Sequence, residues 1–262
     1  MKEPVLAVIP ARLESSRLPR KPLQPILGRP LLQWVWERIR GMKAFDEVVV
    51  ATDAAEVRQL CQAIGAPCVL TNPAHPSGTD RVAEVATRDE FRSFPIILNI
   101  QGDEPLVEED HLARVVALIR EDAWDLATCA SPLRSREALH DPSTVKVVRT
   151  KEGRALYFSR APVPHRRDGS PTPEQLDRPP YLRHLGIYAY RREALAAWVA
   201  LPPSPLEELE RLEQLRALEA GLAMGVAVVE SAAPGVDTAA DVTRMEEAFA
   251  HPGNAITSTD ES

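Results

Sequence analysis

The chain has 262 residues, of which 44% are hydrophobic, so it can bury a large core in one big domain or in two closely packed ones. Its net charge of −7 argues against a nucleic-acid partner, because binding a phosphate backbone requires an extended basic face. We find no signal peptide and no apolar stretch of membrane-spanning length, and we therefore expect a cytoplasmic protein with no membrane partner.

The cysteines point to the same compartment. Cys61, Cys68 and Cys129 are an odd number and include no C-x-x-C pair. We expect buried, apolar thiols of the kind found in a reducing environment, with neither a metal-binding nor a nucleophilic role.

The first half of the chain alternates short apolar runs with helical patterns. We expect strands at 5–9, 48–51, 68–70, 96–100 and 126–130, a helix from Pro30, and helices near 54–64, 81–87 and 108–119. Asp53 stands where the helix 54–64 needs an N-cap, and Gly65 stands where that helix must end. Repeated β-α units predict a doubly wound, mostly parallel sheet with helices on both faces.

The second half is less regular. We expect a hairpin of strands 145–149 and 155–158, a long loop over 162–180, strands at 184–190 and 226–229, and a last helix at 239–249. Ser204 and Glu207 form a capping box that opens one further helix. Five leucines follow at every third position, which covers more than the single stripe of a surface helix and predicts a second apolar partner: Leu206, Leu209, Leu212, Leu215 and Leu218.

A basic loop follows the first strand. Arg12, Arg17, Arg20 and Lys21 lie in a segment bracketed by prolines, which disfavour a helix there and let the side chains converge on one anion. Charge and backbone N–H groups after a buried strand are how an α/β protein binds a polyanion. We infer a nucleoside triphosphate, and the alternative is a solvated basic loop.

Two carboxylates stand at strand ends. Asp103, after the strand 96–100, and Asp237, after the strand 226–229, would repel a triphosphate unless a divalent cation, usually Mg²⁺, lay between. Gly102 allows close approach to the backbone. Each aspartate has a plain alternative role as the N-cap of the helix that follows.

Two further segments carry polar groups. The loop 75–81 is rich in hydrogen-bonding side chains that suit the edge of a base, although it also fits an ordinary N-capped helix start. Alternation along the strand 184–190 places His184, Gly186 and Tyr188 on one face. Gly186 would leave room between two polar rings for a hydroxylated ligand, and the alternative for His184 is a structural role.

Taken together, the motifs resemble one family in order from about Val5 to Phe249. They read PARLESSRLPRKPL, ATD, HPSGTDRVAEV, NIQGDEPLV, DPSTVKVV, ALYFSRAPVP, YLRHLGIYAYRR, LPPSPLEELERLEQLRALEAG and GVDTAAD. The chain thus resembles the 3-deoxy-manno-octulosonate (KDO) cytidylyltransferases. The first motif is common to sugar cytidylyltransferases, whereas ALYFSRAP, LRHLGIY and LEQLR are more specific to the KDO enzymes.

The resemblance implies a role for each matched residue. The nucleotide would be bound by Arg12, Ser15, Arg17, Lys21, Ser77 and Arg81, the metal by Asp103 and Asp237, and the sugar by Gln101, His184, Tyr188, Glu213 and Gln214. Lys21, Arg17, Asp103 and Asp237 would be the catalytic residues. The chain departs from the family at Arg20, where glycine is frequent, and at Glu14, which adds an anion beside the triphosphate.

It also implies a fold and an activity. We expect the nucleotide-diphospho-sugar transferase (Rossmann-like) type, with a smaller mixed α/β lobe, in a single domain over 1–250. Within it, about 1–130 would bind nucleotide, about 131–235 would bind sugar and form a homodimer, and 236–250 would be a closing helix before a polar tail at 251–262. CTP and KDO would yield CMP-KDO and pyrophosphate for lipopolysaccharide synthesis, with Mg²⁺, two ions per site, as cofactor.

Two alternatives remain open from the sequence. One is a cytidylyltransferase for another acidic sugar, such as a sialic acid or an amino-KDO. The other is a nucleotide- or sugar-sensing protein on the same fold without turnover, against which the carboxylate pair and Lys21 argue because a sensor needs no metal activation.

Overall fold

The computed structural model describes residues 2–15, 17–121 and 124–250, so the expected polar tail lies outside the described residues. Its strands are β1 (Val5–Pro10), β2 (Pro25–Ile26), β3 (Arg29–Pro30), β4 (Glu47–Thr52), β5 (Cys68–Leu70), β6 (Ile96–Asn99), β7 (Leu126–Pro132), β8 (Lys146–Arg149), β9 (Ala155–Ser159), β10 (Leu182–Arg191) and β11 (Met224–Val228). Its α-helices are α1 (Leu31–Ile39), α2 (Ala55–Ile64), α3 (Gly78–Thr87), α4 (Glu109–Glu121), α5 (Arg136–His140), α6 (Pro173–Leu176), α7 (Arg192–Val199), α8 (Pro205–Glu210), α9 (Gln214–Glu219) and α10 (Ala239–Ala250).

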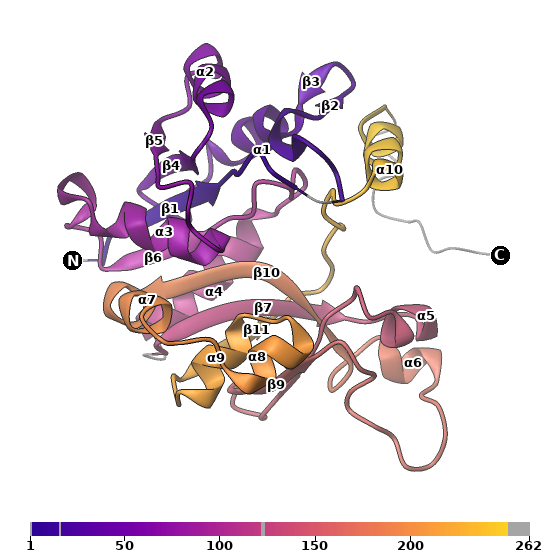
Figure 1. Cartoon of the computed structure of the whole chain (residues 1–262). Coiled ribbons are helices and arrows are strands. Elements are labelled where there is room, and N and C mark those ends of the chain that lie inside the picture. The colour runs from indigo at the N-terminus through magenta and orange to yellow at the C-terminus, as the bar shows by residue number, and fades with distance from the viewer. Residues whose placement is uncertain (1, 16, 122–123, 251–262) are drawn as a thin grey trace.

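One nine-stranded sheet runs through both halves of the molecule (Figure 1). Its main path has the order β11-β7-β10-β6-β1-β4-β5, and the hairpin β8–β9 joins it through β10. The pairs along this path are parallel except for those of β10, which is antiparallel to both β6 and β7. The predicted doubly wound, mostly parallel sheet with a mixed second part is confirmed. The division of 1–250 into three functional parts stays a prediction.

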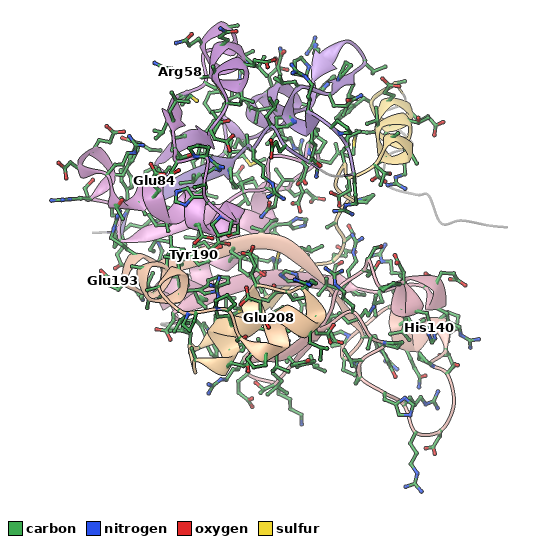
Figure 2. The ribbon with its side chains drawn as sticks, viewed as in Figure 1. Arg58, Glu84, His140, Tyr190, Glu193 and Glu208 are labelled. Carbon is green, nitrogen blue, oxygen red and sulfur yellow. The ribbon has the colours of Figure 1, made fainter. Side chains whose placement is uncertain are left out.

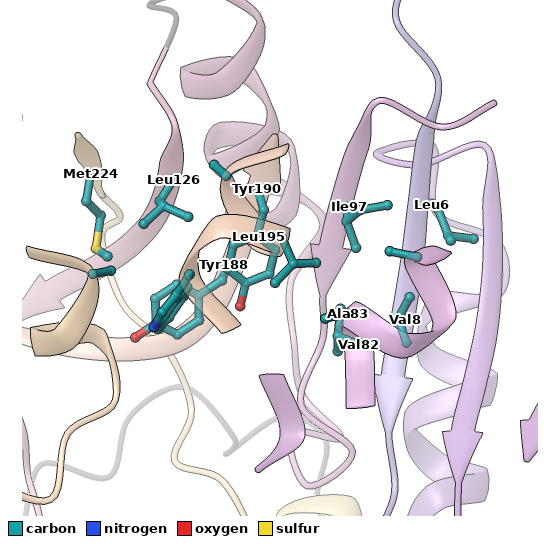
Figure 3. Packing of buried hydrophobic residues seen from close by; sticks show 14 of the residues in the cluster. Leu6, Val8, Val82, Ala83, Ile97, Leu126, Tyr188, Tyr190, Leu195 and Met224 are labelled. Atoms are coloured by element: carbon teal, nitrogen blue, oxygen red, sulfur yellow. The ribbon is translucent and has the colours of Figure 1, made fainter. Parts of the chain in front are cut away.

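Each face of the sheet has its own core. One cluster packs residues of α1, α2 and α4, such as Val35, Val57 and Leu112, against the sheet. The other packs α3, α7 and α9 against the opposite face and extends from Leu6 to Met224 (Figure 3). Apolar burial on both faces explains why β1, and β6 up to Leu98, are continuous apolar runs in the sequence.

Asp53 does not cap α2 as expected. The N-cap position is Ala54, which makes no side-chain cap hydrogen bond, and the Asp53 carboxylate instead accepts a hydrogen bond from Arg81 at 2.7 Å. The partner comes from α3, so local sequence held no sign of it. Gly65 does end α2, in the left-handed conformation with φ 70°, as predicted.

The single helix expected after Ser204 is wrong. The capping box forms, but α8 ends at Glu210, and Arg211 adopts the left-handed conformation with φ 55° before α9 begins at Gln214. Arg160 donates to the carbonyls of Glu210 and Arg211, at 2.8 and 3.3 Å. These bonds satisfy the carbonyls at the end of α8 and stabilise the break.

The segments that flank β10 mostly follow expectation. The hairpin β8–β9 is antiparallel. The segment 162–180 contains only the short helix α6 and lies beside α5, which carries the labelled His140 (Figure 2). Strand β10 is longer than predicted and contains a register shift between Leu185 and Tyr188. The shift interrupts the simple alternation from which one shared face was predicted.

The cysteines are free thiols; Cys61 and Cys129 are buried, as expected, whereas Cys68 is partly exposed, contrary to expectation. None of the described helices combines the length and apolar character that a membrane span requires.

Candidate active site

The two predicted carboxylates meet at the edge of the sheet where β1 and β6 end. The Lys21 ammonium donates to Oδ2 of Asp103 at 2.6 Å and to Oδ1 of Asp237 at 2.7 Å. The lysine lies in the loop after β1, and the aspartates follow β6 and β11, so three distant segments supply the cluster. This is the position at which open α/β sheets bind their ligands.

Lys21 is a largely buried cation held between two anions. Only 15% of its side chain is exposed, against 26% for Asp103 and 40% for Asp237. Burial acts to lower the pKa of Lys21, but the charges and hydrogen bonds of the two aspartates outweigh it and raise that pKa above its ordinary value. The ammonium therefore stays charged throughout the physiological pH range.

The other cations of the basic loop divide between this cluster and an open cavity. Arg17 forms an ion pair with Oδ1 of Asp237 at 2.9 Å. Arg12 and Ser15 line an open cavity of about 640 Å³, together with Glu14 and Arg20. A cavity of this size falls within the range of small-molecule sites. The loop thus presents cations both to the carboxylates and to a space large enough for a nucleotide.

Arg20 has an unusual backbone conformation. It lies in the left-handed region, with φ 55° and ψ 35°, directly before the short 3₁₀ turn that carries Lys21. Glycine adopts this region without strain, which accounts for its frequency here in the resembled family. In this chain the Arg20 guanidinium forms a two-pronged ion pair with Glu56 of α2. This ion pair ties the basic loop to α2, the helix of the neighbouring β-α unit.

The side chain of Asp237 is not the cap of α10. The backbone N–H of Asp241 donates to Oγ1 of Thr238, and the Asp241 carboxylate accepts from the N–H groups of Asp237 and Thr238. Thr238 and Asp241 thus satisfy the start of the helix. Likewise, α4 begins at Glu109, several residues after Asp103. Both carboxylates are left to face Lys21.

This donor set fits Mg²⁺. Among residues 2–15, 17–121 and 124–250, no three His, Cys, Asp or Glu side chains gather as a complete metal cage. Mg²⁺ does not need one, because it commonly takes one or two carboxylates and completes its shell with substrate phosphates and water. Asp103 and Asp237 both lie within hydrogen-bond distance of one nitrogen, so they are close enough to share a cation. That they bind a metal stays a prediction.

The loop 75–81, predicted to lie near the base, forms an ordinary N-capped helix start, which was the alternative. Ser77 is the N-cap of α3, accepting from the N–H of Asp80. The Arg81 side chain is 2% exposed and donates to Asp53 and Thr71. Neither observation tests nucleotide binding, but the buried contacts give Arg81 a structural role as well.

The residues predicted to bind the sugar come from three places: Gln101 follows β6, His184 and Tyr188 lie in β10, and Glu213 and Gln214 lie at the start of α9. The rings of His184 and Tyr188 lie 5.4 Å apart, and Nε2 of His184 lies 3.0 Å from the hydroxyl oxygen of Thr128. Burial lowers the pKa of His184 to about 3, so the ring is neutral, and burial raises the pKa of Tyr188 well above its ordinary value. Both rings are therefore hydrogen-bonding groups rather than ions.

Gly186 does not leave space for a ligand as expected. A Cβ at this position would lie 3.3 Å from the side chain of Gln101, whose amide donates to the Gly186 carbonyl at 3.0 Å. Gln101 fills that space. The glycine is therefore explained by close packing of β10 against the loop after β6.

The break between α8 and α9 brings the last two predicted sugar residues inward. Glu213 accepts a hydrogen bond from the Thr79 hydroxyl at 3.0 Å, and Gln214 is 5% exposed. Burial raises the pKa of Glu213, although hydrogen bonds from Thr79 and Ser77 oppose the rise. Sequence reasoning missed Thr79 as the link between the loop 75–81 and this end of α9.

Thr128 and Asn99 were also missed. Thr128 orients His184, and Asn99 is a buried amide that donates to the hydroxyl of Tyr190. Figure 2 shows Tyr190 near the middle of the molecule, between the two halves of the sheet. A polar residue at the end of an apolar strand is the one signal that marks Asn99 in the sequence.

Comparison with known proteins agrees with this arrangement. The family model described as cytidylyltransferase matches residues 6–228. The 3-deoxy-manno-octulosonate cytidylyltransferase of Gemmatimonas aurantiaca is 48% identical over 92% of this chain and 92% of its own length. That of Chromohalobacter salexigens is 48% identical over 94% and 96%.

Solved structures agree as well. A CMP:2-keto-3-deoxy-manno-octonic acid synthetase complexed with CTP superposes with a TM-score of 0.86 at 40% identity, over 95% of this chain and 99% of that one. A cytidylyltransferase from Leptospira borgpetersenii, at 15% identity and a TM-score of 0.62, shares the fold alone. On sequence and structure together, the chain belongs to the cytidylyltransferase family and, within it, groups with the 3-deoxy-manno-octulosonate cytidylyltransferases.

Proposed function

We propose that the protein transfers CMP from CTP to KDO, giving CMP-KDO and pyrophosphate. The observation that carries the proposal is the convergence of Lys21 and Arg17 on Asp103 and Asp237 at the ligand-binding edge of the sheet. The relatives that match nearly the whole chain carry the name of this activity, and the similar solved structure is a complex with CTP.

The chemistry follows from the charges at this edge. The anomeric hydroxyl of KDO attacks the α-phosphorus of CTP and loses its proton to solvent, the bond from that phosphorus to the oxygen that bridges it to the β-phosphorus breaks, and pyrophosphate leaves with the electron pair. Such a reaction needs positioning and charge neutralisation more than covalent help from the protein. Lys21 and Arg17 supply fixed positive charge for the α-phosphoryl group and the departing pyrophosphate.

Asp103 and Asp237 are the residues that would hold Mg²⁺, and we propose two ions in each site. When bound, Mg²⁺ neutralises phosphate oxygens and lowers the pKa of an attacking hydroxyl. The protein contributes two carboxylates that are already drawn together, so ordering them costs little when substrate arrives.

The sugar is expected to lie between the nucleotide-binding part, about 1–130, and the smaller lobe that follows it. His184, Tyr188 and Glu213 offer polar groups at a part-buried surface, and a buried polar group that loses its partner is costly. A site of this kind discriminates strongly among hydroxylated substrates. It therefore suits one eight-carbon acid better than a range of sugars.

His184→Ala is expected to lower kcat/KM for KDO by roughly 5- to 150-fold, which corresponds to about 1–3 kcal/mol for a buried hydrogen-bonding group left unpaired. The apparent affinity for CTP should stay near the wild-type value, because the cationic loop lies on another segment. Steady-state kinetics with each substrate varied in turn measures both.

His140→Ala is the matched control, since that histidine is exposed on α5. An equal loss of CTP affinity in the His184 variant would mean that the sugar pocket lies elsewhere.

The substrate is tested by pyrophosphate release with CTP, Mg²⁺ and one acid at a time. We expect rapid release with KDO and little with N-acetylneuraminate. Efficient turnover of the sialic acid would replace KDO with the alternative sugar class, and binding of CTP without turnover of any acid would leave a sensor.

We also propose a homodimer. Most of the leucines after Ser204 are used within the chain: Leu212 and Leu215 are buried, while Leu206 and Leu218 pack against the same core. Leu209 of α8 remains 80% exposed, and Leu156 of β9 is 58% exposed. Among the described strands β9 pairs only with β8, and apart from one bridge between Arg154, just before β9, and Gly225 of β11, its other edge is unpaired.

Sedimentation at micromolar concentration should give twice the chain mass of 28.9 kDa. Leu209→Asp should shift the protein toward monomer, because it places a charge in the proposed contact, whereas Leu70→Asp, at an exposed position on β5, should not. A wild-type monomer at every concentration would rule the dimer out.

A further inference from the structure

A third apolar cluster lies apart from the two cores of the sheet. Its buried members are Leu18, Ile26, Leu31, Val236 and Met245, and Trp34, Leu106, Val242 and Phe249 pack against them. In Figure 1, α10 stands away from the sheet, next to β2, β3 and α1, at the end of an extended segment. The cluster is what attaches this helix to the rest of the protein.

The attachment is specific. The rings of Trp34 and Phe249 stack with centroids 4.2 Å apart and planes inclined by 15°. The N–H of Leu27 donates to Glu246 of α10 at 3.0 Å, and the indole N–H of Trp34 donates to the carbonyl of Ile26 at 2.9 Å. The tight turn between β2 and β3 and the indole are therefore both fixed against α10.

Two members of the cluster adjoin catalytic residues in the chain. Leu18 follows Arg17, and Val236 precedes Asp237, so both side chains of that ion pair extend from backbone anchored in the same cluster. The N–H of Val236 also donates to the carbonyl of Asp103 at 2.9 Å. The cluster thus fixes the distance between the loop after β1 and the carboxylate that follows β11.

We propose that α10, held by the stack of Trp34 on Phe249, is a brace that sets the position of Asp237 and Arg17 for metal-assisted catalysis. Trp34 and Phe249 are positioning residues, because they act through the backbone of Leu18 and Val236 and lie outside the carboxylate cluster. The inference rests on the proposed function, since it assigns Asp237 to Mg²⁺.

The brace explains an otherwise unexplained feature of the chain. Asp237 lies 134 residues beyond Asp103 and is joined to the sheet by a segment without secondary structure from the end of β11 to the start of α10. An extended segment alone cannot hold a metal ligand at a fixed distance. Anchoring α10, the helix that follows this segment, fixes the position of Asp237.

The test compares Phe249→Ala with the conservative Phe249→Tyr, which keeps a ring for the stack. Binding of Mn²⁺ in the presence of CTP is measured by calorimetry, and kcat and the KM for KDO are measured with Mg²⁺ varied. Phe249→Ala should weaken Mn²⁺ binding and raise the half-saturating Mg²⁺ concentration about tenfold, in the range typical of residues that orient metal ligands. The KM for KDO should not change, and Phe249→Tyr should restore both values.

Hydrogen exchange gives a readout independent of activity. In Phe249→Ala the amides of α10 and of Leu27, which donates to Glu246 of α10, should exchange faster while those of β1 keep their protection, because the cluster is separate from the main cores. Leu70→Ala, at an exposed apolar site on β5, serves as the control.

Two results would overturn the brace: Mn²⁺ binding unchanged in Phe249→Ala, or a loss of protection in β1 together with equal losses in every kinetic constant. A wild-type protein that neither binds Mn²⁺ with CTP nor releases pyrophosphate would instead defeat the proposed function, which separates the two failures.

Discussion

Asp103→Asn and Asp237→Asn are each expected to lower Mg²⁺-dependent release of pyrophosphate by roughly 10³-fold or more, because each removes a charged ligand of the ion that neutralises the triphosphate. Both carboxylates face Lys21 from outside the main cores, so the fold should survive. The measurement is initial rate against Mg²⁺ concentration, with thermal unfolding of each variant.

Asp110→Asn provides the matched control for charge, because Asp110 is an exposed carboxylate paired with Arg114 on α4. Its activity should equal that of the wild type. If Asp237→Asn unfolds at a lower temperature but turns over normally, then Asp237 serves only the architecture around α10 and has no part in catalysis.

Lys21→Ala is expected to lower kcat by about 10²–10³-fold, equivalent to about 2.7–4 kcal/mol for one fixed charge acting on the transition state. Lys21→Arg should recover only part of this, since a planar guanidinium does not replace a compact ammonium between two carboxylates. Removal of the ammonium also leaves Asp103 and Asp237 facing each other. Thermal stability of Lys21→Ala should therefore depend more on Mg²⁺ than that of the wild type.

Lys43→Ala is the control, because Lys43 is exposed and lies just before the start of β4, whereas the carboxylate cluster lies beyond the ends of the parallel strands. A Lys21→Ala enzyme with near-normal kcat would remove Lys21 from the mechanism.

The fold was predictable where a local rule decides the structure. Strand β5 begins and ends as expected, and Gly65 ends α2, because each depends on residues within a few positions. The break at Arg211 was not predictable, because it depends on Arg160, about fifty residues away. Arg160 donates hydrogen bonds to the backbone carbonyls that a continuing helix would have used. Asp53 was misassigned for the same reason, since its partner Arg81 lies on another helix.

The candidate site also combines features that the sequence predicts with contacts that it does not. Strand ends and chain order predicted that Asp103 and Asp237 would approach the loop of Lys21, and they do. The contacts of Gln101 with Gly186 and of Thr79 with Glu213 depend on side chains that meet only after the sheet has formed. No periodicity in the sequence reports such contacts.

The most direct test of the account follows all phosphorus atoms by ³¹P NMR while the protein acts on CTP, KDO and Mg²⁺. Transfer of CMP to KDO predicts that the α-phosphorus becomes the phosphodiester of CMP-KDO, that one pyrophosphate appears for each phosphodiester, and that neither forms when KDO or Mg²⁺ is omitted. Formation of CDP and inorganic phosphate, or pyrophosphate without a phosphodiester, would contradict it.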